Sequence, residues 1–125
     1  MAVIATTKAP AALGPYSQAI LAGNTVYLSG QVAIDPAKGV LVQDSIENET
    51  EQIMKNLGAV LAAAGCSYAN VVKTTIFATD IKYFDAVNGV YASYFTSEPP
   101  ARSFVQAAAL PKGARVEIEA VAVKS

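Results

Sequence analysis

Residues 44–65 read DSIENETEQIMKNLGAVLAAAG and form the clearest helical pattern in the sequence. Asp44 followed three residues later by Glu47 matches the capping box that begins many helices, and Gly65 is the residue type that commonly ends one. Between them, apolar side chains recur at intervals of three and four residues, which indicates one face packed on a core. These side chains are Ile46, Ile53, Met54, Leu57, Val60, Leu61 and Ala64. We therefore predict one long amphipathic helix.

Segments on both sides of this helix have the pattern of β-strands. Some alternate between apolar and polar residues, and others are rich in β-branched and aromatic side chains. The predicted strands cover residues 17–22, 25–34, 71–79, 101–108 and 115–123. Asp80 is positioned to cap a second helix, which carries Phe84 and Tyr91 on its apolar face and ends before Pro99.

This order of elements predicts an α+β fold, a two-layer sandwich with one mixed sheet and both helices on one face. A length of 125 residues suits one domain, residues 1–125. In the last strand, Val121 and Val123 extend the face that carries Glu117 and Glu119. A second subunit covering that face is the favoured interpretation. The alternative is that both valines are simply exposed, as single apolar residues often are.

Composition excludes several classes of chemistry. The chain is 53% hydrophobic and 15% charged with a net charge of −1, which argues against disorder. It has no His and one Cys, so a Ser-His-Asp relay, a disulfide within the chain and an imidazole metal site are ruled out, and no metal or cofactor is expected. Nucleic acid binding is not expected because no basic stripe is present. With no membrane span and no signal peptide at the start, we expect a cytoplasmic protein.

Three sets of residues are candidates for chemistry. Arg102 opens an otherwise uncharged strand, where it could hold a planar anion such as a carboxylate; a structural ion pair is an equally good alternative. Glu117 and Glu119, about 7 Å apart on one strand face, could orient water or carry a proton, or simply face solvent. Tyr16 follows a Gly-Pro turn, where it could contact a ligand or belong to the core. Gly30 indicates a simple bend, a bulge or a close approach of a ligand to the backbone.

Four motifs resemble the reactive intermediate deaminases, the RidA or YjgF/YER057c/UK114 family, and the resemblance runs essentially from end to end. The motifs are PARSFVQAAALPKGARVEIEA at residues 100–120, GPYSQA at 14–19, LSGQ at 28–31, and NGVY at 88–91 with Tyr94 and Phe95. The family resemblance implies a chorismate-mutase-like fold and a homotrimer with a site at each subunit interface. It implies hydrolysis of enamine and imine intermediates, such as 2-aminoacrylate and 2-iminobutyrate, to 2-keto acids and ammonia without a cofactor.

The same resemblance implies roles for individual residues. Arg102 would hold the substrate carboxylate, Glu119 would bind the attacking water and Tyr16 would help to position the substrate. Further substrate-binding residues would be Ser29, Gly30, Phe84, Asn88 and Phe104. Phe104 stands where many members have Cys, so we expect a changed substrate preference rather than a loss of activity.

Two other functions remain open from the sequence. The first is a regulatory protein that binds small metabolites such as keto acids without turnover. The second is a ribonuclease or translation inhibitor, an activity attached to some family members, although the lack of His and the acidic balance argue against RNA binding.

Overall fold

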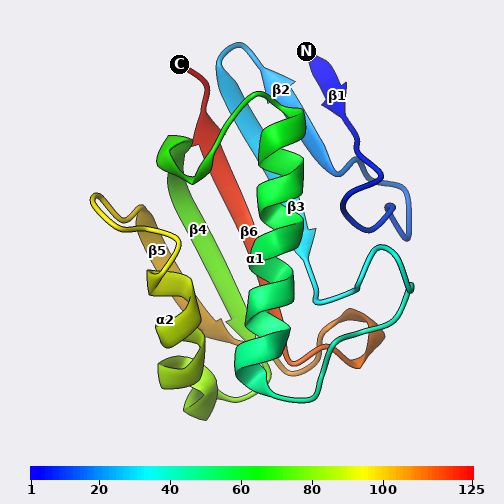
Figure 1. The fold of residues 1–125 in the computed structure, drawn as a ribbon, viewed down its shortest axis with the longest axis vertical. Coiled ribbons are helices and arrows are strands. Elements are labelled where there is room, and N and C mark those ends of the chain that lie inside the picture. The colour runs from blue at the N-terminus through cyan, green and yellow to red at the C-terminus, as the bar shows by residue number, and fades with distance from the viewer.

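The computed structural model describes residues 1–125 as a six-stranded sheet with two helices on one face (Figure 1). The strands are β1 (Ala2–Ile4), β2 (Ala19–Ala22), β3 (Thr25–Gln31), β4 (Val71–Ala78), β5 (Ala101–Gln106) and β6 (Val116–Val123). Their order in the sheet is β1-β2-β3-β6-β4-β5. Only β4 and β5 are parallel, and the other neighbours are antiparallel. The predicted α+β sandwich with one mixed sheet and both helices on one face is confirmed.

Helix α1 (Ile46–Ala63) is the long helix that the sequence predicted, but its cap is one residue later than expected. Ser45 is the N-cap: its backbone is extended and its hydroxyl accepts a 3.0 Å hydrogen bond from the Asn48 amide. Asp44 instead accepts a hydrogen bond from the Asn48 side chain at 2.8 Å. Gly65 follows the helix with φ +77°, a left-handed conformation in which glycine meets no steric penalty.

Helix α2 (Phe84–Ala92) is shorter than predicted at both ends. The Asp80 side chain does cap a helix, but it is a single 3₁₀ turn over Ile81–Tyr83, where the carboxylate accepts from the Lys82 amide. The helix also ends before Phe95, which falls inside the predicted helix because that helix was expected to run up to Pro99. Phe95 nevertheless packs on the helix, because its ring centroid lies 4.8 Å from that of Tyr91.

The strands differ from prediction mainly at the start of the chain and around Gly30. Strand β1 was missed, since three residues are too few to show an alternating pattern. Strand β3 ends at Gln31 rather than residue 34, because its register with β6 shifts between Leu28 and Gln31. Residues 31–34 are all buried, so the predicted alternation stops at this irregularity.

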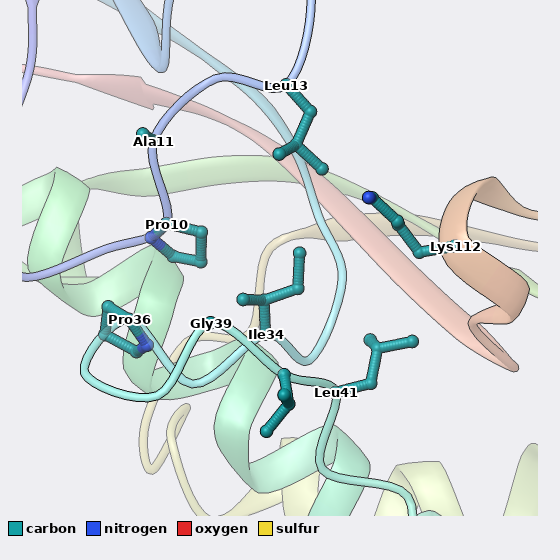
Figure 2. Close-up of a pocket in the computed structure, with 9 residues that line it drawn as sticks. Pro10, Ala11, Leu13, Ile34, Pro36, Gly39, Leu41 and Lys112 are labelled. Carbon is teal, nitrogen blue, oxygen red and sulfur yellow. The ribbon is translucent and has the colours of Figure 1, made fainter.

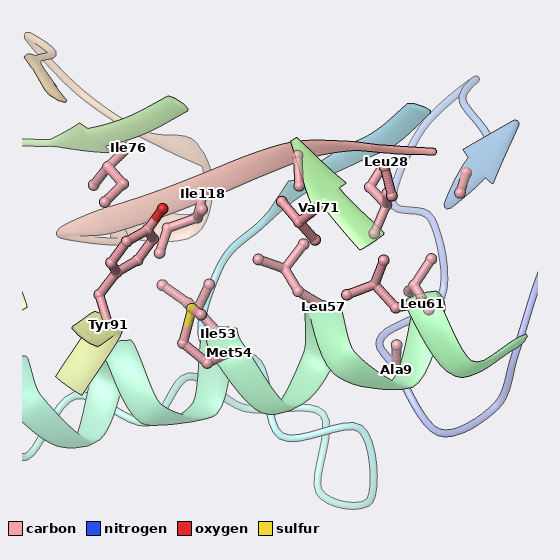
Figure 3. Close-up of a cluster of buried hydrophobic side chains, with 14 of the residues drawn as sticks. Ala9, Leu28, Ile53, Met54, Leu57, Leu61, Val71, Ile76, Tyr91 and Ile118 are labelled. Carbon is pink, nitrogen blue, oxygen red and sulfur yellow. The ribbon is translucent and has the colours of Figure 1, made fainter. Parts of the chain in front are cut away.

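The main core lies between α1 and the sheet (Figure 3). Ile53 and Leu57 of α1 are completely or almost completely buried, and they face a sheet surface that includes Ile118. Alternate residues of β6 are buried as predicted, and these are Val116, Ile118, Ala120 and Ala122. Burying one such Ile or Leu side chain stabilises the fold by about 1.5–3 kcal/mol. No helix has the length and apolar character needed to cross a membrane.

A buried carboxylate fastens α1 to the beginning of β6. Glu49 is 0% exposed, and its Oε2 accepts hydrogen bonds from the amides of Arg115 at 2.8 Å and Val116 at 3.2 Å. Its Oε1 pairs with Arg115 Nε at 2.8 Å. A buried charge requires such partners, because an unpaired one is costly. Arg115 therefore has a structural role, because its guanidinium pairs with the buried Glu49.

Candidate functional site

The predicted site residues fall into two groups on opposite faces of the sheet. Thr74 of β4 pairs with Arg102 on one side and with Ala120 on the other. Its neighbour Thr75 pairs with Ser103 and with Glu119. Paired residues share a face and successive residues alternate between faces. Arg102 therefore lies on the helix face, with buried Ala120, whereas Glu119 lies on the face that the helices leave uncovered.

The first group, which we call the arginine cluster, consists of Arg102, Phe84, Asn88, Tyr91 and Phe104. Arg102 Nη1 donates a 2.6 Å hydrogen bond to Asn88 Oδ1. Three aromatic rings surround the guanidinium, with Cζ lying 5.1 Å from the centroid of Tyr91, 5.4 Å from that of Phe84 and 5.8 Å from that of Phe104. These distances fit cation–π contacts.

Helix α2 and strand β5 bring this cluster together. Phe84, Asn88 and Tyr91 are spaced by four and three residues, so they share one helix face next to the edge strand β5. The expectation that Phe104 shares the face of Arg102 is confirmed, and its ring lies 5.0 Å from that of Phe84. The sequence had assigned Tyr91 only to the core, although its spacing from Asn88 could have shown that it belongs here.

A hydrogen bond to Thr74 of β4 holds the Tyr91 side chain in place. Its hydroxyl lies 2.7 Å from the Thr74 hydroxyl. Burial raises the pKa of Tyr91, while the hydrogen bond to Thr74 and the charge of Arg102 act in the opposite direction. The phenol therefore supports Arg102 as a neutral, fixed ring.

Arg102 has no acidic partner within the chain, which contradicts the alternative of a structural ion pair with a neighbouring carboxylate of the same chain. The two ion pairs of the chain join Lys82 to Asp80 and Arg115 to Glu49. One of the five N–H donors of the Arg102 guanidinium is used by Asn88, which leaves the others for a ligand. An unpaired guanidinium among aromatic rings suits a planar carboxylate that can bind through both oxygens.

The second group lines a hollow of about 370 Å³ on the opposite face, which we call the carboxylate pocket. It contains five residues that the sequence named as candidates, including both carboxylates of β6, together with three apolar residues. The full lining is Leu13, Tyr16, Ser29, Gly30, Val32, Pro111, Glu117 and Glu119. Glu117 and Glu119 thus share a strand face, as the sequence predicted.

Gly30 leaves room for the Glu117 side chain. A Cβ atom added to Gly30 would overlap the Glu117 carboxylate, so any other residue at this position requires that side chain to move. The sequence suggested a bulge or a ligand close to this backbone; in the structure the group close to it is the Glu117 side chain, and the position coincides with the shift in register between β3 and β6. Burial raises the pKa of Glu117, and the nearby charge of Glu119 raises it further.

The loop that carries Tyr16 is held against β3 by two hydrogen bonds from Ser29. The Ser29 hydroxyl donates to the Ser17 carbonyl at 2.6 Å, and the Ser29 amide donates to the Gln18 carbonyl at 2.9 Å. Tyr16 is 48% exposed, and its hydroxyl accepts from the Leu13 amide at 3.2 Å. The alternative that Tyr16 belongs to the core is therefore wrong.

A more apolar hollow of about 450 Å³ lies beside the carboxylate pocket (Figure 2). Leu13 lines both hollows. The Lys112 ammonium points toward the Leu13 side chain (Figure 2). None of the predicted site residues lines this second hollow. No three His, Cys, Asp or Glu side chains lie close enough together to hold a metal ion.

Comparison with known proteins decides the family. The family model described as endoribonuclease L-PSP matches residues 6–124. The chain belongs to this family. Within it, the chain is 54% identical over 122 residues to human 2-iminobutanoate/2-iminopropanoate deaminase, a match that covers 98% of this chain and 89% of the human protein. The resemblance to the reactive intermediate deaminases is thereby confirmed.

Solved structures of this family agree with the fold. RidA from the Antarctic bacterium Psychrobacter has a TM-score of 0.95 and 44% identity, covering 98% of this chain and 99% of that one. E. coli TdcF, crystallised with bound serine, has a TM-score of 0.96 and 38% identity, and the match covers both chains completely.

Proposed function

We propose that this chain is a hydrolase that converts reactive 2-imino acids and their enamine tautomers, such as 2-iminobutanoate and 2-aminoacrylate, into 2-keto acids and ammonia. The observation that carries the proposal is the unpaired Arg102 guanidinium, which fits the carboxylate that all these substrates share. The name of the human relative, an imine deaminase at 54% identity, supports the same reaction.

In this proposal the arginine cluster binds the substrate. The free N–H groups of Arg102 hold the carboxylate in a bidentate pair, and Asn88 fixes the plane of the guanidinium. The rings of Phe84 and Phe104 exclude water from one side, which strengthens the ion pair. The substrate is thus anchored by its charge, with its imine carbon directed away from the cluster.

The carboxylate pocket supplies the attacking water. Glu119 orients a water molecule toward the imine carbon and accepts its proton, and Tyr16 and Ser29–Gly30 border the bound substrate. An imine is already electrophilic, so a positioned water and a carboxylate base suffice. The product after loss of ammonia is a 2-keto acid, which keeps the carboxylate that Arg102 binds.

The two groups work together only if they come from different copies of the chain. Within one copy the sheet separates them, since Arg102 lies on the helix face and Glu119 on the opposite face. We infer a homotrimer in which β5 of one copy lies beside the carboxylate pocket of the next, giving one site at each interface. The uncovered sheet face supports this assembly, because Tyr27, Val105 and Val123 there are 53%, 43% and 43% exposed in the single chain.

The test compares wild type with Arg102→Ala and Arg102→Lys. We expect wild type to accelerate the release of ammonia and 2-oxobutanoate from freshly generated 2-iminobutanoate, and Arg102→Ala to abolish this acceleration. Arg102→Lys should recover little, because a lysine keeps the charge without the fork. Binding of 2-oxobutanoate by a wild type that does not accelerate imine decay would instead favour the metabolite-binding alternative.

The nuclease alternative has less support. The family description names an endoribonuclease, but the pocket that carries Glu117 and Glu119 presents two carboxylates, which would repel a phosphate backbone. Loss of any RNA-cleaving signal on further purification would dispose of this alternative.

A further inference from the structure

The segment that carries Tyr16 depends on few contacts for its position. Residues 11–16 are all exposed, so packing does little to hold them. Tyr16 also lines two hollows, the carboxylate pocket and another of about 480 Å³. Exposed segments with few fixed contacts open easily unless polar groups fasten them. The place of Tyr16 at the pocket therefore needs a specific cause.

Hydrogen bonds between this segment and the rest of the chain converge on one side chain. We call residues 6–16 the Tyr16 loop. Inside the loop, the Tyr16 amide donates to the Gly14 carbonyl at 2.8 Å, and the Leu13 amide donates to the Tyr16 hydroxyl at 3.2 Å. Such bonds shape the loop but do not attach it to the sheet. Every hydrogen bond that leaves the loop goes to the side chain of Gln18.

The Gln18 amide holds the loop at two points. Its Oε1 accepts a 2.7 Å hydrogen bond from the Thr6 amide, and its Nε2 donates to the Thr6 carbonyl at 3.1 Å. The same nitrogen donates to the Pro10 carbonyl at 2.7 Å. Gln18 is only 5% exposed, and a buried amide is stable only when its polar atoms have partners. The loop supplies these partners for both ends of the amide.

These partners require an amide at position 18. The Thr6 N–H group needs an acceptor, the two carbonyl groups need a donor, and a glutamine side chain offers both. A glutamate of the same shape would keep the acceptor but would turn an oxygen toward the Thr6 and Pro10 carbonyl oxygens. The hydrogen-bonding pattern, in addition to the size of the side chain, therefore selects glutamine.

The backbone of Gln18 connects the loop to the carboxylate pocket. Its carbonyl accepts a 2.9 Å hydrogen bond from the Ser29 amide, and Ser29 lines the pocket together with Tyr16. The next residue, Ala19, begins β2 and is 1% exposed. Gln18 thus stands at a fixed point of the sheet, from which its side chain reaches the loop.

We propose that Gln18 is a positioning residue for the proposed hydrolysis, because its amide holds Tyr16 at the edge of the carboxylate pocket. This inference rests on the proposed deaminase function. Gln18 does not line the pocket itself, so it acts through Tyr16. Without the amide, the loop keeps only its two ends and the buried Ala9 as anchors. Tyr16 then borders the substrate less often, and the substrate is less often aligned with the attacking water.

The first measurement is a double-mutant comparison of kcat/KM for 2-iminobutanoate. We expect Gln18→Met, which keeps the length of the side chain but loses its hydrogen bonds, to lower kcat/KM about tenfold. In the Tyr16→Ala background the same change should cost less than about twofold, because a residue that acts through Tyr16 has no further effect once Tyr16 is removed. Gln18→Glu should behave like Gln18→Met, and it supplies the same comparison if Gln18→Met does not fold.

Asn70→Leu is the matched control. The Asn70 amide also joins two backbone groups, since it accepts from the Ser67 amide at 2.9 Å and donates to the Val123 carbonyl at 3.0 Å. It lines no part of the carboxylate pocket. This variant loses a comparable pair of hydrogen bonds away from the Tyr16 loop, so it should keep the wild-type kcat/KM.

The second measurement does not depend on activity. Lys8 lies in the Tyr16 loop, Lys38 lies in a different loop, and both side chains are exposed. We expect trypsin to cleave after Lys8 about fivefold faster in Gln18→Met than in wild type, because cleavage follows the local opening of the chain. Cleavage after Lys38 should keep its wild-type rate in both proteins.

The outcomes separate this inference from the proposed function. The inference alone would be overturned if wild type accelerates imine hydrolysis but Gln18→Met costs the same factor with Tyr16 present and in the Tyr16→Ala background. Unchanged cleavage after Lys8 would overturn it as well. A wild type without any acceleration of imine hydrolysis would overturn the proposed function, and the positioning role with it.

Discussion

The side chains of Arg102 and Glu119 project from opposite faces of the same sheet, although both residues belong to the C-terminal motif of residues 100–120. Their strands flank β4, where Thr74 pairs with Arg102 and the adjacent Thr75 pairs with Glu119. A substrate of a few atoms cannot reach both residues within one copy. The proposed assembly, in which copies share a site, accounts for the apolar residues that the single chain exposes on one sheet face.

Phe104 should control which imines are accepted. Its ring packs on Phe84 at 5.0 Å and occupies space beside the Arg102 guanidinium. We predict that Phe104→Cys favours larger imines, raising the ratio of kcat/KM for the imine of leucine to that for 2-iminobutanoate by about tenfold. An unchanged ratio, in a variant with a wild-type melting temperature, would show that the ring does not border the substrate.

Gly30 should not tolerate even one added methyl group. A Cβ there overlaps the Glu117 carboxylate, so Gly30→Ala must displace that side chain. We predict that Gly30→Ala lowers kcat, because the displaced Glu117 side chain changes the lining of the pocket that holds Glu119.

The matched control for this change is Gly89→Ala in α2. A Cβ at Gly89 has no neighbour within 4 Å, so this variant should keep full activity and gain about 0.5–1 kcal/mol in the free energy of unfolding. Equal activity of the two alanine variants would contradict the assigned role of Gly30.

Glu49 should matter for stability. Removing its side chain leaves the amides of Arg115 and Val116 without acceptors and the Arg115 guanidinium without its ion pair. We predict that Glu49→Ala lowers the free energy of unfolding by about 3 kcal/mol, measured in urea. Glu47→Ala, two residues earlier and exposed, should cost less than about 1 kcal/mol. Similar losses in both variants would contradict the structural role of Glu49.

Tyr94 should make stability fall at high pH. Burial raises its pKa to about 12, and its 2.6 Å hydrogen bond to Glu51 acts in the same direction. Because the folded-state pKa exceeds the unfolded value of about 10, the contribution is complete below pH 10 and is lost as the pH rises through about 12. Tyr94→Phe should therefore show a shallower fall in unfolding free energy over this range. Parallel curves for the two proteins would contradict the prediction.

The sequence predicted the elements whose pattern repeats along the chain. Helix α1 and strand β6 bury one face at regular intervals, so Leu57 and Ile118 could be assigned to the core directly. Strand β1 is too short to show a repeating pattern. The N-cap is Ser45 rather than the predicted Asp44, and the sequence could not distinguish them because both residue types suit that position. Boundaries of this kind depend on backbone geometry that the residue types alone do not determine.

The candidate site was predictable as a set of residues but not as an arrangement. Family motifs identified Arg102, Glu119 and Tyr16, yet the face of each strand depends on the register with β4, which no single segment encodes. Tyr91 looked like core because an aromatic residue on a helix serves packing and a binding site equally well. The commitment of Arg115 to Glu49 likewise appears only once α1 and β6 are packed together.

The most direct test of the shared site mixes two inactive variants. Arg102→Ala keeps an intact carboxylate pocket, and Glu119→Gln keeps an intact arginine cluster. Unfolded together in equal amounts and refolded, they should form mixed trimers in which about a quarter of the interfaces pair an intact Arg102 with an intact Glu119. We predict that the mixture regains about a quarter of the wild-type rate of 2-iminobutanoate hydrolysis. A mixture that forms trimers but stays as inactive as its two parents would contradict a site assembled between copies.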